Sequence, residues 1–332
     1  MKKIIVVFMG LILALSFAGC GRSRPDAADG RLQVVATIFP QFDFVRHIAG
    51  ERVALTMLLS PGAESHGFEP TPRDMLTINS ADLLIYAGGH GDVWVRPILT
   101  SLGREDMRTV ALLDLVDAVV QHHHHHHDHG HHHAHGHHDD DCDECCAIDL
   151  GHHHHEPHYD EHVWTCPRNA IAIVRSLAET LSELDPDNAY YFRANAGAFI
   201  TELEALDRAF ADVVANAART TVIFGDRFPF RYLIDTYGLT HFAAFDGCCA
   251  QTQASPATIA MLIETVRREN IPVVFYIEFS NRLIANVIAE ATGARLLELH
   301  SLHNVSHADF TAGVTYLDLM RRNVQALREA LN

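Results

Sequence analysis

Apolar runs alternate with amphipathic stretches from residue 32 to residue 113. The run 32–39 has the apolar character of a strand buried on both faces of a sheet, and 40–49 has the spacing of a helix that ends at Gly50. The same order repeats downstream, with strands expected at 53–59, 82–87 and 108–113 and helices at 72–80 and 93–102. This alternation predicts a doubly wound α/β unit with a mainly parallel sheet.

The pattern changes at Pro167, where two long helices are expected, over 167–184 and 186–218, with apolar residues at helical spacing. Alternation then resumes, with strands expected at 221–224, 239–245, 272–277 and 295–299 and helices at 228–237, 256–270, 281–292 and 309–331. The sequence therefore predicts an α/β protein of two similar lobes with mainly parallel sheets, joined by a long rigid helix. We place the N-terminal lobe at 31–165, the helical connector at 166–218 and the C-terminal lobe at 219–332.

The first twenty residues have the pattern of a bacterial lipoprotein signal peptide. Lys2 and Lys3 precede an apolar run that is too short to span a membrane, and small residues stand just before Cys20. Cleavage there would make Cys20 the lipidated N-terminus, with 21–30 as a polar tether to the membrane surface. The alternative is ordinary secretion without a lipid anchor.

Composition narrows the class of partner. The formal net charge is -17, and the only lysines are those of the signal peptide. This charge argues against binding to nucleic acid and to anionic lipid surfaces. With 332 residues and 48% hydrophobic content, it can bury the core that a carrier or an enzyme needs.

A histidine-rich insert at 114–160 interrupts the first lobe. The insert contains most of the histidines, an acidic cluster at 139–141 and three cysteines, and it has no regular period. This composition predicts a loop that binds metal ions weakly. The alternative is a solvated spacer without function. The collecting histidines are His122, His123, His124, His125, His126, His127, His129, His131, His132, His133, His135, His137, His138, His152, His153, His154, His155 and His158.

Four side chains follow predicted strands or close the loop after one. In parallel sheets, ligands bind beyond the carboxyl ends of the strands, so these residues should face one site in the cleft between the lobes. They are far apart in the chain and obey no local spacing rule, so only the fold can assemble them. The four are His66, His162, Asp226 and His300.

Two segments resemble motifs of a known family. Residues 61–72, with the sequence PGAESHGFEPTP, look like the PPGxxxHxxEPTP loop of the metal-binding lipoproteins of zinc and manganese ABC importers, the family of ZnuA and AdcA. Residues 160–167, DEHVWTCP, resemble the DPHVWLDP segment of that family, and Trp164 in it is expected to be a packing residue. With the long helices and the histidine-rich insert, the resemblance covers essentially the whole chain after the signal.

The resemblance implies metal ligands at His66 and His162 by direct match. It places the third family ligand, usually His in zinc carriers and Glu in manganese carriers, at Asp226, and the fourth, usually Asp, at His300. Both positions depart from the commonest pattern. The departures compensate, because the set still contains three histidines and one carboxylate.

Several of these assignments have rivals in the sequence. Asp226 could instead pair with Arg227 or Arg231, and His303 and His307 follow His300 closely. Glu278 follows a strand and could hold a ligand imidazole by its second nitrogen, or could pair with Arg282 one helical turn away.

Six cysteines remain after Cys20. Export permits disulfides, but the three in the histidine-rich insert could equally be metal ligands. Cys166 stands where the family usually has Asp or Ser, and a disulfide to Cys248 or Cys249 is open. The insert cysteines are Cys142, Cys145 and Cys146.

The sequence thus predicts an exported, membrane-anchored lipoprotein that binds Zn²⁺ with high affinity between two lobes and delivers it to the permease and ATPase of an ABC importer. We expect a monomer without enzymatic activity. Nitrogen-rich ligation favours Zn²⁺ over Mn²⁺, although a manganese carrier of the same family is the near alternative. A zinc-dependent hydrolase would use similar ligands but needs an open coordination position for water, and a free-standing metal buffer or adhesin-like surface protein would use the same site without a transporter.

Overall fold

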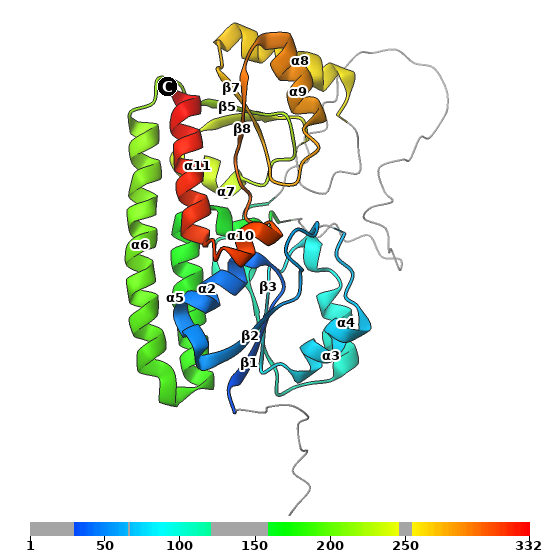
Figure 1. Ribbon diagram of the computed structural model, residues 1–332, viewed down its shortest axis with the longest axis vertical. Helices are drawn as coiled ribbons and strands as arrows, with labels where there is room; N and C mark the ends of the chain where they lie inside the picture. Colours follow the sequence, from blue (N-terminus) through cyan, green and yellow to red (C-terminus); the bar gives the residue numbers. More distant parts are fainter. Residues whose placement is uncertain (1–29, 66, 121–158, 246–253) are drawn as a thin grey trace, which may run out of the picture. The chain divides into compact units, whose positions relative to one another are not determined.

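Two four-stranded parallel sheets form the frame of this computed structural model, which describes residues 30–65, 67–120, 159–245 and 254–332. Residues 32–332 belong to one unit (Figure 1). The first sheet has the order β2-β1-β3-β4 and the second the order β6-β5-β7-β8, so the two lobes share one topology. The strands are β1 (Leu32–Ala36), β2 (Val53–Met57), β3 (Leu83–Tyr86), β4 (Arg108–Ala111), β5 (Thr221–Phe224), β6 (Thr240–Ala243), β7 (Val273–Tyr276) and β8 (Arg295–Glu298).

Helices cover both faces of each sheet, as the predicted α/β class requires. On the outer faces, α3 (Pro72–Ser80) and α4 (Val95–Leu102) pack on the first sheet, and α8 (Pro256–Glu269) and α9 (Leu283–Thr292) on the second. Because both faces are buried, successive residues of one strand enter different cores: Val34 lies in the inner core and Val35 in the outer one. The helix α7 (Arg231–Tyr237) follows β5. Two α/β lobes with parallel sheets confirm the predicted fold class.

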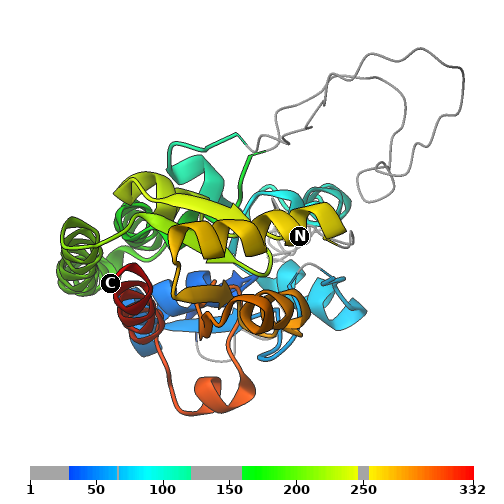
Figure 2. The same cartoon turned by 90° about the horizontal axis from the view of Figure 1, so that it is seen from above.

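The inner faces of the two sheets share one core with a layer of helices. This layer contains α2 (Phe39–Ala49), α5 (Pro167–Leu184), α6 (Ala189–Ala215) and α11 (Tyr316–Leu331), and both views show α5, α6 and α11 side by side (Figures 1 and 2). The connector is therefore an antiparallel pair of helices rather than one rod, because Asp185 and Pro186 end α5 and a short turn reverses the chain. Since buried residues of both lobes and of the connector form a single cluster, the lobes are coupled through packing.

The C-terminal helix predicted at 309–331 is two helices, α10 (His307–Thr311) and α11. Gly313 has a φ of 73°, a left-handed conformation that ends the first helix, and Thr315 begins the second by accepting a hydrogen bond from the backbone N–H of Asp318. The apolar spacing continues across this break, so periodicity alone does not reveal it. In the part of the chain that the structure describes, every helix is too short or too polar to cross a bilayer.

Candidate metal centre

His162 is held by a short segment that enters the connector. The segment begins at Tyr159, which bridges Val120, and ends in a single 3₁₀ turn over Val163–Thr165. Trp164 in that turn is completely buried, and its Nε1 donates to the carbonyl of Ser301 at 2.9 Å. This anchor fixes the backbone of His162, whose side chain is only 3% exposed. The expected packing role of Trp164 is confirmed.

The ring of His162 is oriented by the carboxylate of Asp160. Oδ1 of Asp160 lies 2.6 Å from Nδ1 of His162 and also accepts the backbone N–H of His162 at 2.9 Å. An ionised carboxylate can only accept, so Nδ1 carries the proton and the lone pair is on Nε2. Burial by itself lowers the pKa of His162, but Asp160, Glu161 and Glu278 raise it by more, so the pKa lies above its usual value.

Glu161 faces a glycine-rich turn of the first lobe. Its Oε2 accepts the backbone N–H of Gly91 at 2.7 Å, and the side chain is buried. A Cβ atom on Gly89 would lie 2.3 Å from both Cβ and Oε2 of Glu161, which no real structure tolerates. The turn therefore leaves room for this carboxylate only because positions 89 and 91 have no side chain.

A second carboxylate, that of Asp92, lies behind Glu161. Its Oδ2 accepts the backbone N–H groups of Ala87 at 2.5 Å and Gly88 at 3.3 Å. Burial, and after it the charge of Glu161, raise the pKa of Asp92 to about 7. Two buried carboxylates in one place favour a cation nearby.

His303 completes the group. Its ring stands almost perpendicular to that of His162, with centroids 4.7 Å apart, and its backbone carbonyl accepts the N–H of Phe39 at 3.3 Å. Glu161, His162 and His303 are all buried, and each offers one ligand atom within 4.8 Å of the others. Among the described residues this is the one group of three such side chains. Two imidazoles and a carboxylate are a ligand set that suits Zn²⁺.

A small cavity of about 20 Å³ opens beside this group. Its lining includes Glu161 and His303 from the group and Ser65 and Phe68 from the loop that resembles the family motif. His66 itself lies outside the described residues, so its ligand role stays a prediction. Its neighbours Ser65 and Phe68 nevertheless line the same cavity as the group.

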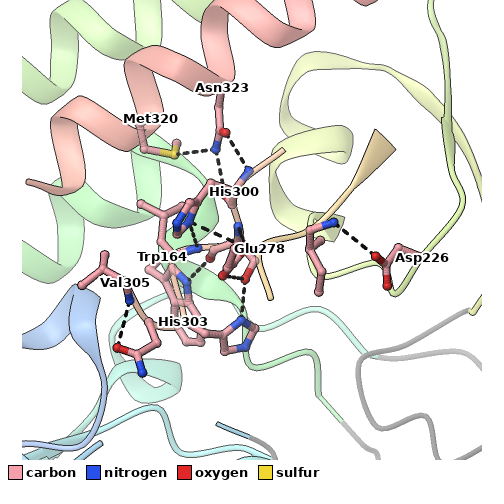
Figure 3. A network of polar contacts seen from close by, with 12 residues as sticks. Trp164, Asp226, Glu278, His300, His303, Val305, Met320 and Asn323 are labelled. Carbon is pink, nitrogen blue, oxygen red and sulfur yellow. Dashed lines mark hydrogen bonds and ion pairs between the residues drawn. The ribbon is translucent and has the colours of Figure 1, made fainter. Parts of the chain in front are cut away.

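His300 does not belong to this group, and Figure 3 shows its contacts with Asn323 and Glu278. Nδ1 of His300 accepts the backbone N–H of Leu302 at 3.0 Å and lies 3.7 Å from Glu278, while Asn323 of α11 holds its backbone N–H and carbonyl, each at 2.8 Å. The lone pair of Nδ1 is therefore engaged in the turn. His300 was the expected ligand because it lies just beyond the carboxyl end of β8. In the structure the chain continues through Leu302, which has a left-handed conformation (φ 66°), and it is His303 that lies beside His162.

Asp226 is buried at the end of β5 and bonds to backbone. Its carboxylate accepts the N–H of Arg227 at 2.9 Å and that of Ile277 at 3.3 Å. The two arginines considered as its partners pair elsewhere: Arg227 with Glu64 at 3.2 Å, and Arg231 with Asp235 at 2.6 Å. The group around His162 contains neither Asp226 nor His300, and their ligand roles stay predictions.

Glu278 faces the group around His162. The ion pair with Arg282 that the sequence left open is not formed. The Arg282 guanidinium lies over the ring of Tyr276, 4.0 Å from its centroid. The Glu278 carboxylate instead accepts the backbone N–H of Ser301 at 2.7 Å and the Ser301 hydroxyl at 2.5 Å.

Cys166 is buried, and its Sγ lies 3.3 Å from the hydroxyl of Thr236. Its predicted partners Cys248 and Cys249 lie outside the described residues, as do Cys20 and residues 121–158 of the histidine-rich insert. The disulfide, the lipidation and the weak metal collection therefore stay predictions.

Two α/β lobes of the same topology around a buried histidine–carboxylate group are the architecture of a two-lobed metal-binding protein. Residues 34–330 match the family model of the zinc-uptake complex component A, periplasmic, and the chain belongs to this family. The predicted family is confirmed. The family consists of components for zinc uptake and not of enzymes, which sets the hydrolase hypothesis aside.

Similar proteins carry names that agree with this family. The zinc-binding lipoprotein AdcA of Streptococcus pneumoniae is 29% identical over 329 residues, which are 99% of this chain and 61% of AdcA, so the chain spans about three fifths of that relative. The high-affinity zinc uptake system protein ZnuA of Bacillus subtilis is 28% identical, with 99% and 98% covered. The crystal structure of the Zn(II)-bound ZnuA-like domain of S. pneumoniae AdcA matches with a TM-score of 0.70 at 25% identity, covering 91% of this chain and 99% of that domain.

Proposed function

We propose that the chain is the extracytoplasmic zinc-binding component of an ABC importer, which captures Zn²⁺ between its lobes and delivers it to a permease. The observation that carries this proposal is the buried group of Glu161, His162 and His303, whose ligand atoms lie within 4.8 Å of one another. Family membership and the names of the relatives AdcA and ZnuA support it.

The proposed coordination set is His66, His162, His303 and Glu161. Compared with the set expected from the sequence, His303 takes the place of His300, and Glu161 takes the place of Asp226. The exchange keeps three imidazoles and one carboxylate, so the net charge of the expected site is preserved. Four protein ligands fill the tetrahedron that Zn²⁺ adopts in closed sites.

The transport partners and the membrane anchor belong to the same proposal. A permease and an ATPase receive the ion, and lipidated Cys20 holds the monomeric carrier at the extracytoplasmic side of a bacterial membrane. One of the relatives is itself named a lipoprotein. The insert histidines would bind further ions weakly, as their composition suggests.

Replacing His303 by Ala tests the site. Removing one imidazole from the tight site should weaken zinc binding at least tenfold, which corresponds to about 1.4 kcal/mol. A competition titration of metal-free protein with a chromophoric chelator measures this, with Mn²⁺ titrated in parallel to separate the zinc carrier from the manganese carrier.

Two matched histidine variants complete the design. His307→Ala, at an exposed position, should leave the affinity unchanged, and His300→Gln should change it by less than about threefold. A loss on replacing His300 with none on replacing His303 would contradict the proposed set and restore the expected one. Tighter binding of Mn²⁺ than of Zn²⁺ would favour the manganese carrier.

A further inference from the structure

Behind His303 lies a chain of two buried hydrogen bonds that ends on a carboxylate. The Ser301 hydroxyl is 2.7 Å from Nδ1 of His303 and 2.5 Å from Oε1 of Glu278, and Oε2 of Glu278 accepts the backbone N–H of Ser301 at 2.7 Å (Figure 3). All three residues are buried, and Ser301 is completely so. Glu278 follows β7 and Ser301 follows β8, so two adjacent strands place the chain of bonds.

The direction of these bonds follows from counting protons. An ionised carboxylate has acceptors only, and a serine hydroxyl has one hydrogen. Ser301 therefore donates its hydrogen to Glu278, and its oxygen can only accept from His303. The proton of the neutral ring must then be on Nδ1, and the lone pair on Nε2.

We propose that Ser301, with Glu278 behind it, is a positioning residue that selects Nε2 of His303 as the zinc ligand; this rests on the proposed function. The selection has a counterpart in His162, where the carboxylate of Asp160 acts directly at 2.6 Å. Both imidazoles thus offer Nε2 to the metal. The Asp160 carboxylate holds the Nδ1 proton of His162, and the Ser301 hydroxyl holds that of His303. Neutral imidazole in water favours the opposite tautomer, so without Ser301 the lone pair of His303 would lie mainly on Nδ1.

Glu278→Gln tests the direction of the bonds with almost no change in shape. The Gln oxygen can still accept the Ser301 N–H, and its amide nitrogen then donates to the Ser301 oxygen. The hydroxyl hydrogen is forced toward His303, whose Nδ1 must accept it. The variant should therefore convert His303 from the Nδ1–H to the Nε2–H tautomer and weaken zinc binding about 10–100-fold, the usual effect of losing such a partner.

Long-range ¹⁵N–¹H correlation spectra of the metal-free, histidine-labelled full chain read the tautomer directly, at a pH where the ring is neutral. The resonances of His303 are assigned by their absence in His303→Gln. Wild type should show Nδ1–H, and Ser301→Ala should lose it together with zinc affinity. Ser301→Thr keeps the hydroxyl and should retain the wild-type tautomer, which a purely structural role of Ser301 does not predict.

An Nε2–H tautomer in the wild type, or an unchanged tautomer in Glu278→Gln, would overturn the proposal whatever the zinc affinity. Because the tautomer is measured without metal, it is independent of the proposed function. Absence of zinc binding by wild type would refute that function and leave the spectra to decide on the hydrogen bonds.

Discussion

The carboxylate of Glu161 lies where it does because the turn that faces it has glycine at positions 89 and 91. Backbone strain does not require the glycine at position 89, since its φ of -100° is open to any residue. The constraint is space: a Cβ added to Gly89 would meet Glu161 at 2.3 Å. These glycines therefore shape the proposed metal centre although they have no side chain that could bind a metal.

Gly89→Ala should therefore displace Glu161 and weaken zinc binding by more than tenfold, while overpacking lowers the free energy of unfolding by about 1–3 kcal/mol. Chelator competition and urea unfolding measure the two effects. Gly197→Ala is the control, since Gly197 is an exposed position of α6 where an added Cβ meets nothing within 4 Å. It should raise the free energy of unfolding by about 0.5–1 kcal/mol and leave zinc affinity unchanged. Equal zinc affinity in Gly89→Ala and wild type would show that Glu161 does not bind the ion.

The sequence alone identifies His162 as a ligand of the proposed centre, but it does not identify His303 or Glu161. His162 stands in a recognisable motif and directly after the acidic pair that begins with Asp160, so its role is readable. His303 was only a rival of His300, because the left-handed conformation of Leu302 redirects the loop and no glycine marks it. Glu161 stands where the family motif has proline, so a comparison of motifs gives it no role.

At the scale of helices and strands, the sequence predicted each of the eight strands found in the described residues. The signal is plainest in central strands such as β3 and β7, which are buried on both faces and therefore almost continuously apolar. The sequence pattern missed the division between α10 and α11, since the hydrophobic period runs on through Gly313. The residues that cap α11 indicate the division instead. Thr315 and Asp318 form a reciprocal capping box, in which the Thr315 backbone N–H and hydroxyl both donate to Asp318.

The Thr315 hydroxyl, helped by the backbone bond and nearby arginines, holds the pKa of Asp318 below its usual value despite some burial. A lowered folded-state pKa means that this stabilisation is present above the unfolded pKa of about 3.9 and is lost as the pH falls through the folded value. Asp318→Ala should lower the free energy of unfolding by about 1 kcal/mol at pH 7. The difference from wild type should shrink below about pH 4. Urea unfolding across this pH range measures both, and a difference that grows on acidification would contradict the assignment.

For the molecule as a whole, the shared core predicts cooperative unfolding. The inner faces of both sheets and the helical layer form one cluster of buried residues, so neither lobe has an inner core of its own. Urea unfolding followed by far-UV circular dichroism and by tryptophan fluorescence should give coincident transitions. Two separated transitions would show that the lobes unfold independently.

Zinc should stabilise this single folded state. At a free concentration one thousand times the dissociation constant, a one-site ligand raises the free energy of unfolding by about 4 kcal/mol. The measured increase should be smaller, because the many histidines of the unfolded chain also bind zinc. His303→Ala, compared with His307→Ala, should lose most of the increase in a thermal unfolding experiment.

The segment from His300 to Val305 also bears on the order in which the protein folds. Asn304 donates to the carbonyls of Ser60 and Ala63, at 2.7 and 2.9 Å, and the first of these bonds joins residues 244 apart in the chain. Contacts between such distant residues form late, because the loop they close must lose its entropy first. The proposed centre therefore cannot form until the segment from His300 to Val305 has docked on the loop that contains Ser60 and Ala63. Zinc binding would then report that this docking between distant parts of the chain has taken place.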